Sequence, residues 1–359
     1  MNPKALSVKS NTAICLTETK QLLSITEQIL NAKALSVPEN RWLDELIAWA
    51  VQKNISDYHH DRDKGRNVGL PRNSLEVLRL TKLDLRDHQL NELHHAIGRL
   101  KNLTKLDVGW NQLSQLPSSI ANLTELTELC FNANKLTGLP EFIGELKRLK
   151  VLHLGGNYLS VLPKSIGKLE HLTELYLWKN KLNCLPESIG ELPVLTELYL
   201  SHNALQSLPA TIGQLRQLQK LYLSSNRLTT LPYSITELEN LNELYLSDNF
   251  LAPVPEFIGE LQQLEKLSLA NNQLSEVPLF ISRLSNLKKL SLAGNKITRI
   301  PEFICHLPQL AELSLQKNKI NDLPEFITQL PQLKVLDLSK NPINKIPPRL
   351  NHFKKVIKL

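Results

Sequence analysis

The sequence predicts an α/β solenoid, a fold in which one short structural unit is repeated along the chain. Two observations carry this prediction: 76 of the 359 residues are leucine, and a leucine pattern recurs every 23 residues without an insertion or deletion. The apolar content of 42% suffices for a large core and excludes a disordered chain. No apolar run approaches the roughly 18 residues of a membrane span. The N-terminus also lacks the continuous apolar stretch of a secretory signal peptide.

The repeating pattern is LxxLxLxxNxLxxLPxxIxxLxx, and we number the positions of each unit from its first leucine. The twelve units begin at Leu80, Leu103, Leu126, Leu149, Leu172, Leu195, Leu218, Leu241, Leu264, Leu287, Leu310 and Leu333. The apolar residues of LxxLxL predict a short strand whose inward side chains alternate with outward ones. Successive strands would pair in parallel about 4.8 Å apart, which gives one sheet of roughly 50 Å.

Two other positions predict the turns of each unit. Position 9 is asparagine in eleven units, from Asn111 to Asn341, and a buried amide there can satisfy backbone groups of the turn that leaves the strand. Position 15 is proline in eleven units, from Pro117 to Pro347, which fixes φ where the chain returns across the convex side. The first unit has histidines at both positions, a departure typical of terminal repeats.

This pattern resembles the leucine-rich repeat family over about three quarters of the chain. The resemblance implies a horseshoe with a parallel β-sheet on its concave face. The LPxxIxxL segment is similar to the cytosolic class, which includes Ras-group scaffold proteins and effectors of intracellular bacterial pathogens. The chain differs from the secreted bacterial ubiquitin ligases, whose repeats are shorter and precede a catalytic domain. The resemblance thus implies a binding scaffold, cytoplasmic or secreted into a host cell without a cleaved signal peptide. Small GTPases and other signalling proteins are the partners it suggests.

The two ends of a solenoid need caps, because the terminal core face would otherwise meet water. We interpret residues 1–79 as an N-terminal helical cap with a polar linker. Residues 80–355 form the twelve repeats, and residues 356–359 form the start of a C-terminal capping strand. That strand, the thirteenth, would begin with Val356 and Leu359.

Two helices and a loop are expected in the cap. A helix over residues 17–33 would carry Leu22, Ile25, Ile29 and Leu30 on one face. A second helix would begin at the capping box of residues 36–39 and turn Trp42, Leu46, Trp49 and Ala50 inward. A polar loop over residues 57–67 would follow.

The outward side chains of the strands do not pack in the core, so they can vary and determine which partner binds. Position 5 holds tyrosine in four consecutive units, at Tyr176, Tyr199, Tyr222 and Tyr245. Trp178 stands two residues after the first of these tyrosines, His202 is nearby, and Trp110 lies nearer the N-terminal end. Aromatic residues make up only 5% of the chain, and we expect most of its exposed aromatic surface on the strip that these residues form. Tyrosine and tryptophan are frequent at the centres of protein interfaces. A second interpretation, compatible with the first, is a stacking ladder that stabilises the sheet.

We therefore expect a protein partner on the concave face. The predicted partner-binding residues are Trp110, Cys130, His153, Glu174, Tyr176, Trp178, Glu197, Tyr199, His202, Lys220, Tyr222, Glu243, Tyr245 and Asp248. The net charge of the outward side chains changes along this face: it is negative in units 3–8 and positive in units 9–12. This difference would orient the partner. Residues 334–359 hold +6 of the formal net charge of +7, so we interpret the basic C-terminal end as a solubilising cap.

Other functional classes are weaker alternatives. Nucleic-acid binding through the basic C-terminal end is one, but the basic residues do not follow the aromatic strip. An enzyme active in the cap is another, through a metal held by His59 and His60, although adjacent histidines match no standard ligand spacing. Cys130 and His153 share a column on neighbouring strands and would allow a thiol–imidazole dyad. We expect no enzyme, no cofactor, no metal and no nucleic acid. We also expect a monomer, with self-association through an exposed solenoid end as the alternative.

The four cysteines are Cys15, Cys130, Cys184 and Cys305, and their wide spacing predicts reduced thiols in a cytosol-like compartment.

Overall fold

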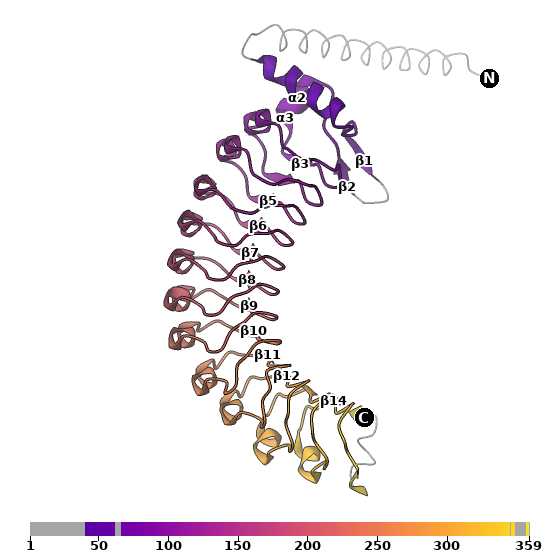
Figure 1. Cartoon of the computed structure of the whole chain (residues 1–359), viewed down its shortest axis with the longest axis vertical. Coiled ribbons are helices and arrows are strands. Elements are labelled where there is room, and N and C mark those ends of the chain that lie inside the picture. The colour runs from indigo at the N-terminus through magenta and orange to yellow at the C-terminus, as the bar shows by residue number, and fades with distance from the viewer. Residues whose placement is uncertain (1–39, 62–65, 345, 349–356, 359) are drawn as a thin grey trace, which may run out of the picture.

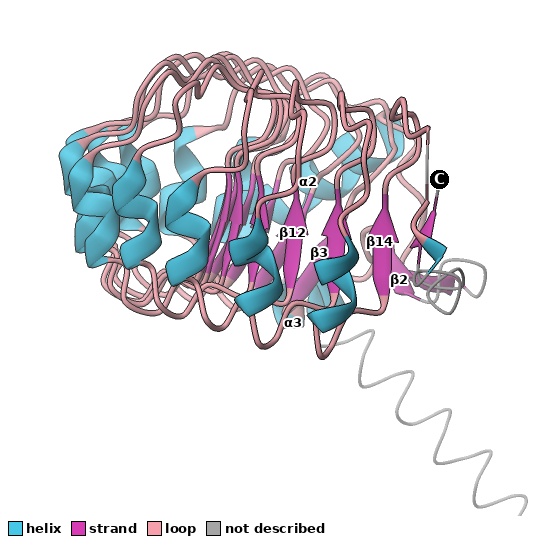
Figure 2. Cartoon of the chain, turned by 90° about the horizontal axis from the view of Figure 1, so that it is seen from below, coloured by secondary structure: helices cyan, strands magenta, loops and turns pink. Residues whose placement is uncertain are grey.

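The computed structural model describes residues 40–61, 66–344, 346–348 and 357–358. Its main feature is a parallel sheet of 13 strands that lie side by side in sequence order. Figure 1 shows these strands on the inner side of an arc and the short helices of the repeats on the outer side. The same two layers are seen from below in Figure 2. The predicted α/β solenoid with a parallel concave sheet is confirmed.

Each repeat contributes one strand of three residues, at positions 3–5. These strands are β3 (Lys82–Asp84), β4 (Lys105–Asp107), β5 (Glu128–Cys130), β6 (Val151–His153), β7 (Glu174–Tyr176), β8 (Glu197–Tyr199), β9 (Lys220–Tyr222), β10 (Glu243–Tyr245), β11 (Lys266–Ser268), β12 (Lys289–Ser291), β13 (Glu312–Ser314) and β14 (Val335–Asp337). Neighbouring strands pair with an offset of one unit, so that Leu198 lies opposite Leu221.

The convex side is built from five-residue 3₁₀ helices. They are η2 (His95–Arg99), η3 (Ser118–Asn122), η4 (Glu141–Glu145), η5 (Lys164–Lys168), η6 (Glu187–Glu191), η7 (Ala210–Gln214), η8 (Tyr233–Glu237), η9 (Glu256–Glu260), η10 (Leu279–Arg283), η11 (Glu302–His306) and η12 (Glu325–Gln329). From η3 on, the residue before each helix is the repeat proline, with φ between −60° and −76°. The predicted role of position 15 at the start of the convex segment is therefore confirmed.

The core is a continuous column of leucine and isoleucine between the sheet and the 3₁₀ helices. In the sixth unit Leu195, Leu198, Leu200, Leu205 and Ile212 are all fully buried. Each such side chain stabilises the fold by about 1.5–3 kcal/mol through burial. Because every unit repeats this pattern, the stability of the array is close to a sum over units and their contacts.

The asparagines of position 9 join each unit to the one before it. Asn226 donates from Nδ2 to the carbonyl oxygens of Leu223 in its own unit (2.9 Å) and Leu200 in the preceding unit (3.0 Å). Its Oδ1 accepts from the backbone N–H of Leu205, also in the preceding unit, at 3.0 Å. Most of these side chains are buried. They satisfy turn backbone that would otherwise be unpaired, as predicted.

Position 8 adopts the left-handed conformation in all twelve units. Gly156 and Gly294 have φ of +68° and +66°, and the ten other residues have φ between +51° and +62°. Non-glycine residues adopt this conformation at a cost of about 1–2 kcal/mol. The turn after every strand therefore requires it, whatever the side chain, and the sequence pattern alone did not reveal this.

The described part of the cap contains two helices and a hairpin. Helix α2 (Arg41–Gln52) buries the predicted inward residues Trp42, Leu46, Trp49 and Ala50. Helix α3 (Ser74–Arg79) is capped by Asn73, whose Oδ1 accepts from the N–H of Leu75 at 2.9 Å. The helix predicted over residues 17–33 and the capping box of residues 36–39 lie outside the described residues, as does Cys15.

The expected polar loop over residues 57–67 is wrong in part. Strands β1 (His59–Asp61) and β2 (Arg66–Val68) pair as an antiparallel hairpin. Polar side chains join its strands, since His60 Nδ1 lies 2.9 Å from Asn67 Oδ1, and Asn67 Nδ2 donates to Tyr58 Oη at 2.9 Å. His59, His60 and Asn67 are exposed and Val68 is buried, so the hairpin lacks the apolar alternation that marks a half-buried strand.

A thirteenth parallel strand is present, but its register differs from the prediction. Strand β15 (Ile357–Lys358) pairs with β14 so that Ile357 lies opposite Leu336, an offset of 21 residues where the repeats have 23. Ile357 thus takes the column predicted for Leu359. Val356 and Leu359 themselves lie outside the described residues.

Candidate functional site

The centre of the concave face is a continuous stack of five rings, formed by His153, Tyr176, Tyr199, Tyr222 and Tyr245, which we call the aromatic ladder. Successive ring centroids are 4.3, 4.4, 4.4 and 4.5 Å apart, and the planes are within 21° of parallel. The spacing follows from the pairing of position 5 with position 5 on neighbouring strands. The predicted stacking ladder is therefore confirmed.

Glutamates at position 3 hold the hydroxyl groups of the ladder. Tyr176 Oη donates to Glu174 at 2.7 Å and Tyr199 Oη donates to Glu197 at 2.5 Å. Tyr222 and Tyr245 both donate to Oε2 of Glu243, at 3.0 and 3.2 Å. Burial raises the pKa of all four phenols, and the bound carboxylates raise it further. The rings are thereby fixed in orientation and remain neutral.

Lysines on adjacent strands bind the same carboxylates. Lys220 Nζ lies 2.7 Å from Glu197 Oε1, and Lys266 Nζ lies 2.7 Å from Glu243 Oε1. Burial disfavours the charged form of Glu243. Hydrogen bonds from Lys266, Tyr222 and Tyr245 nevertheless outweigh burial and hold the pKa of this carboxyl below its ordinary value. Two of the three ladder carboxylates, Glu197 and Glu243, are thus paired with lysines within the sheet, whereas Glu174 accepts from Tyr176.

Trp178 lies beside the ladder and packs against Gly155, a residue that was not among the predicted site residues. A Cβ atom at Gly155 would lie 2.3 Å from Trp178 Cε2, so the indole packs directly on the backbone of the preceding unit. Lys179 Nζ lies 5.7 Å from the centroid of the indole ring. The available signal was the Gly155–Gly156 pair, which is unique among the repeats.

Three predicted residues occupy the left-handed turns, outside the ladder. Trp110, His202 and Asp248 are all at position 8 and exposed, in units 2, 6 and 8. They share an edge of the solenoid but belong to separate units, and the structure does not bring them together. Trp110 is 67% exposed at φ +58°, an outlier for a bulky residue.

The expectation that most exposed aromatic surface lies on the concave strip is wrong. The ladder tyrosines are only partly exposed, because each ring covers its neighbours. Among the described residues, Trp110 of this strip is strongly exposed, but Tyr58, Tyr158, Tyr233 and Phe250 are exposed away from it.

Cys130 and His153 lie opposite each other on β5 and β6, as predicted. Cys130 is only 8% exposed, and burial together with the Asp107 carboxylate raises the pKa of its thiol to about 12. His153 stacks on Tyr176, and burial lowers its pKa. The thiol is therefore protonated at neutral pH, which does not suit a nucleophile.

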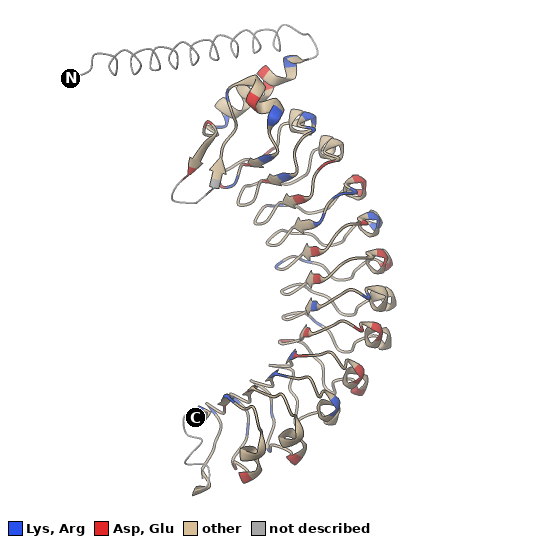
Figure 3. Cartoon of the chain, turned by 180° about the vertical axis from the view of Figure 1, so that it is seen from behind, with Lys and Arg blue, Asp and Glu red and all other residues tan. Residues whose placement is uncertain are grey.

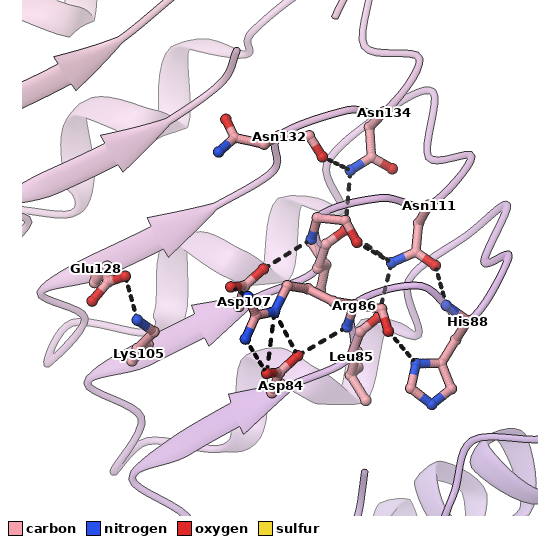
Figure 4. A network of polar contacts seen from close by, with 12 residues as sticks. Asp84, Leu85, Arg86, His88, Lys105, Asp107, Asn111, Glu128, Asn132 and Asn134 are labelled. Atoms are coloured by element: carbon pink, nitrogen blue, oxygen red, sulfur yellow. Dashed lines mark hydrogen bonds and ion pairs between the residues drawn. The ribbon is translucent and has the colours of Figure 1, made fainter. Parts of the chain in front are cut away.

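A polar network closes the N-terminal end of the face (Figure 4). Arg86 Nη2 donates to Asp84 at 2.6 Å, and Arg86 Nε lies 3.1 Å from Asp107 Oδ2. The hydrogen bond to Asp84 raises the pKa of Arg86, and Asp107 is 5% exposed. Asn111 completes the first unit, which lacks its own asparagine, by accepting from the N–H groups of His88 and Leu90. This network is structural in character.

The histidines of the cap hairpin have partners within the cap. His59 Nδ1 lies 2.7 Å from the carbonyl oxygen of Asp57, and His60 binds Asn67. Over residues 40–61, 66–344, 346–348 and 357–358, no group of three metal-ligating side chains gathers. None of the helices in that part of the chain has the length and hydropathy of a membrane span.

The fold and this face define a class, the curved repeat scaffolds with a concave parallel sheet. The sequence model of the leucine-rich repeat region matches residues 72–155 and 198–292, and further leucine-rich repeat models match residues 147–205, 286–307 and 308–352. The chain belongs to the leucine-rich repeat family. Domains of this family are protein-interaction modules that use their extended concave surfaces.

Solved structures agree with this assignment. A leucine-rich repeat protein of Leptospira interrogans is 33% identical, with a TM-score of 0.56 over 87% of this chain and 98% of that one. The Drosophila Toll–Spatzle complex is 27% identical with a TM-score of 0.64, over 74% of this chain and 38% of that one. An internalin of Listeria monocytogenes shares the fold at 23% identity and a TM-score of 0.65, over 88% and 94%. A search of curated proteins found no match.

Proposed function

We propose that the protein is a non-enzymatic scaffold that binds a protein partner on its concave face, with the aromatic ladder at the centre of the interface. One observation carries the proposal: five stacked rings, four with hydroxyl groups fixed by carboxylates, form a rigid strip at the middle of the arc. Such a strip is ordered before binding, so little side-chain entropy is lost when a partner docks. Aromatic rings with one polar handle are the side chains that dominate interface energies.

Residues around the ladder supply the remainder of the proposed site. Trp178, held on Gly155, extends the apolar strip towards the turn edge. Trp110 presents a large ring that is 67% exposed at the turn edge of the second unit, and tryptophan is frequent among the residues that dominate interface energies. The other predicted residues frame this surface, except Cys130, which is buried.

The partner class is proposed from family resemblance and from the neighbours. The Toll neighbour was solved with Spatzle, and the ectodomain of a plant membrane receptor kinase, 28% identical, was solved with Casparian strip integrity factor 2. We propose a signalling protein, such as a small GTPase, bound by a monomer of this chain. Action as a bacterial effector on host signalling, in the cytoplasm or after secretion into the host, belongs to the same proposal.

The test is affinity capture with ladder variants of the full chain. Tyr199→Ala/Tyr222→Ala removes two rings from the middle of the stack, whereas Tyr199→Phe/Tyr222→Phe keeps the rings and removes only the hydroxyls. Tyr233→Ala, on the convex side, is the matched control because Tyr233 is 64% exposed there. We expect the double alanine variant alone to lose a specific partner from bacterial or eukaryotic lysates. Retention of every captured protein by a folded double alanine variant, checked by circular dichroism, would contradict the proposal.

A further inference from the structure

The turn edge next to the ladder carries a set of cations that the concave face does not neutralise. Lys135, Lys179, Lys181 and Arg227 stand at positions 8 and 10 of units 3, 5 and 7, and all four are exposed. Together with the rings of Tyr158 and Trp178 they form what we call the lysine rim. The edge continues towards the C-terminus with Lys296, Lys317, Lys319 and Lys340.

Acidic residues are absent from this edge in units 2–7, whereas the flanking units 1 and 8 carry Asp87 and Asp248 at position 8. Positions 7–13 of units 2–7 contain these four cations and no aspartate or glutamate. The acids of the same units stand on the strands or on the convex side, as the red segments of Figure 3 illustrate. Three of the strand carboxylates, those of Glu128, Glu197 and Glu243, bind lysines of neighbouring strands and not the cations of the turn edge.

Neutral groups support the cations of the lysine rim without reducing their charge. Lys135 Nζ donates to Gln112 Oε1 at 3.0 Å, and Lys181 Nζ lies 4.8 Å from the centroid of the Tyr158 ring. Lys179 lies over Trp178. Strand lysines such as Lys220 and Lys266 differ, because each binds a glutamate. The rim therefore presents full positive charge on side chains that are already positioned.

We propose that the lysine rim binds a row of carboxylates on the same protein partner that docks against the aromatic ladder. This inference rests on the proposed function and deepens it by naming the chemistry of the partner. Within the fifth unit Tyr176, Trp178, Lys179 and Lys181 follow one another from strand to turn, so the two surfaces are continuous. The partner would carry an apolar patch with an acidic edge, and charge complementarity would fix its orientation.

The density of charge favours protein carboxylates over a nucleic-acid backbone. Units stacked about 4.8 Å apart place the cations of unit 5 about 10 Å from those of unit 3 and about 10 Å from that of unit 7. Carboxylates two turns apart on a helix are separated by about 11 Å, whereas duplex DNA carries a charge every ~1.7 Å. A polyphosphate laid across the ladder would also meet Glu174, Glu197 and Glu243 on the strands.

The first experiment uses fluorescein-labelled deca-glutamate and decathymidylate as probes at low ionic strength. The rim variant is Lys135→Gln/Lys179→Gln/Lys181→Gln. The control is Lys147→Gln/Lys164→Gln/Lys168→Gln, which removes the same net charge from the convex side. We expect the full chain to bind deca-glutamate, with an affinity that falls about tenfold in the rim variant, less than twofold in the control, and steeply with added salt.

Three results would overturn this inference. They are no binding of deca-glutamate by the wild type, an equal loss in both variants, or tighter binding of decathymidylate that also depends on the rim. A second experiment separates the inference from the proposed function, by repeating the affinity capture with the rim variant. A partner that is lost from the ladder variant and retained by the rim variant would contradict the rim and leave the scaffold intact. A partner lost only from the rim variant would contradict the role of the ladder.

Discussion

At the scale of single residues, the concave face depends on backbone positions as much as on side chains. Gly155 is the support of Trp178, and its missing Cβ leaves the space that the indole fills. Position 8 imposes the left-handed conformation on residues as different as Trp110 and Ala133. The close packing at Gly155 and the left-handed turn at position 8 both determine the direction of side chains at the turn edge, and a partner would recognise that arrangement.

Gly155→Ala is expected to displace the indole of Trp178. The new Cβ would lie 2.3 Å from the ring, so either the ring moves or the turn shifts, and overpacking of this kind costs about 1–3 kcal/mol. Tryptophan fluorescence and urea unfolding measure both effects. Gly138→Ala is the control, because nothing lies within 4 Å of a Cβ there. Unchanged fluorescence and stability in Gly155→Ala would show that the indole does not rest on this backbone.

Ala133→Gly is expected to stabilise the protein, the reverse of the usual effect of glycine. Ala133 has φ +52°, and glycine removes the penalty of that conformation, for an expected gain of about 1 kcal/mol in the free energy of unfolding. Ala204→Gly, at position 10 and also half-buried, should instead lose about 0.5–1 kcal/mol. Chemical denaturation measures the change in the free energy of unfolding for each variant. A change of the same sign in both variants would contradict a left-handed penalty at Ala133.

At the scale of elements, the repeated asparagine and the repeated tyrosine perform different tasks. The asparagines close turns across unit boundaries, and the tyrosines stack along the sheet. The first task concerns stability throughout the array. The second concerns a stretch of strands from β6 to β10, after which Ser268 begins a shallow hollow of about 270 Å³ over the remaining strands.

Asn226→Ala is expected to destabilise the protein by about 1–3 kcal/mol. The change leaves the buried N–H of Leu205 without its partner, and an unsatisfied buried group costs about that much, whereas the carbonyl oxygens of Leu200 and Leu223 still accept from Asn203 and Asn249. Asn183→Ala, at the exposed position 12, serves as the control. Denaturant unfolding should give a clearly lower free energy of unfolding for Asn226→Ala than for Asn183→Ala. Equal values would contradict the stabilising role of the asparagine at position 9.

The ladder predicts a loss of stability in alkaline solution. The pKa of each ladder phenol is raised above its ordinary value of 10.0 in the folded chain. Their contribution is therefore complete below pH 10 and is lost as the pH rises through the folded values, because the unfolded phenols ionise first. Absorbance titration at alkaline pH, compared with unfolding followed by circular dichroism, measures this.

The quadruple variant with phenylalanine at Tyr176, Tyr199, Tyr222 and Tyr245 provides the comparison, because it keeps four rings and removes the phenols. We expect its stability to fall less steeply above pH 10. Identical alkaline profiles for this variant and the wild type would rule out the contribution of the ladder.

At the scale of the whole molecule, the array behaves as a one-dimensional stack in which each unit contacts its neighbours. Removal of one complete unit, residues 264–286, should therefore leave a folded and shorter solenoid. We expect unchanged helix and strand signals per residue, and a denaturant m-value lower by roughly a twelfth. Removal of residues 264–275 takes a strand and its turn but leaves the rest of the unit. That deletion should expose the core and reduce cooperativity, and equal tolerance of both deletions would contradict the unit model.

The array could be predicted from the sequence because every column repeats twelve times and has a simple physical role. Buried leucine, turn asparagine and convex proline all reappear in the structure where the pattern placed them. The hairpin around His60 could not be predicted, since its exposed polar strands lack apolar alternation. The 21-residue step to Ile357 also escaped prediction, because it breaks the period itself.

The candidate site was predicted only at its centre. Position 5 revealed the ladder because identical residues in paired strands must stack. The pairing of Glu243 with Lys266, and the contact of Trp178 with Gly155, depend on side-chain directions that a count of charges or aromatics does not contain. The net charge also gave no sign of the lysine rim. Residues 1–333 sum to +1, yet the cations of Lys135, Lys181 and Arg227 gather along one edge.

The asparagine bonds have a direction along the chain. The turn that contains Leu205 is completed by Asn226 of the following unit, and the turn that contains Leu228 is completed by Asn249 of the unit after that. During synthesis each unit must therefore wait for its successor to leave the ribosome before its backbone is fully paired. The last unit to emerge is therefore the least protected from proteases, and fully paired structure advances towards the C-terminus one unit behind the chain that has left the ribosome.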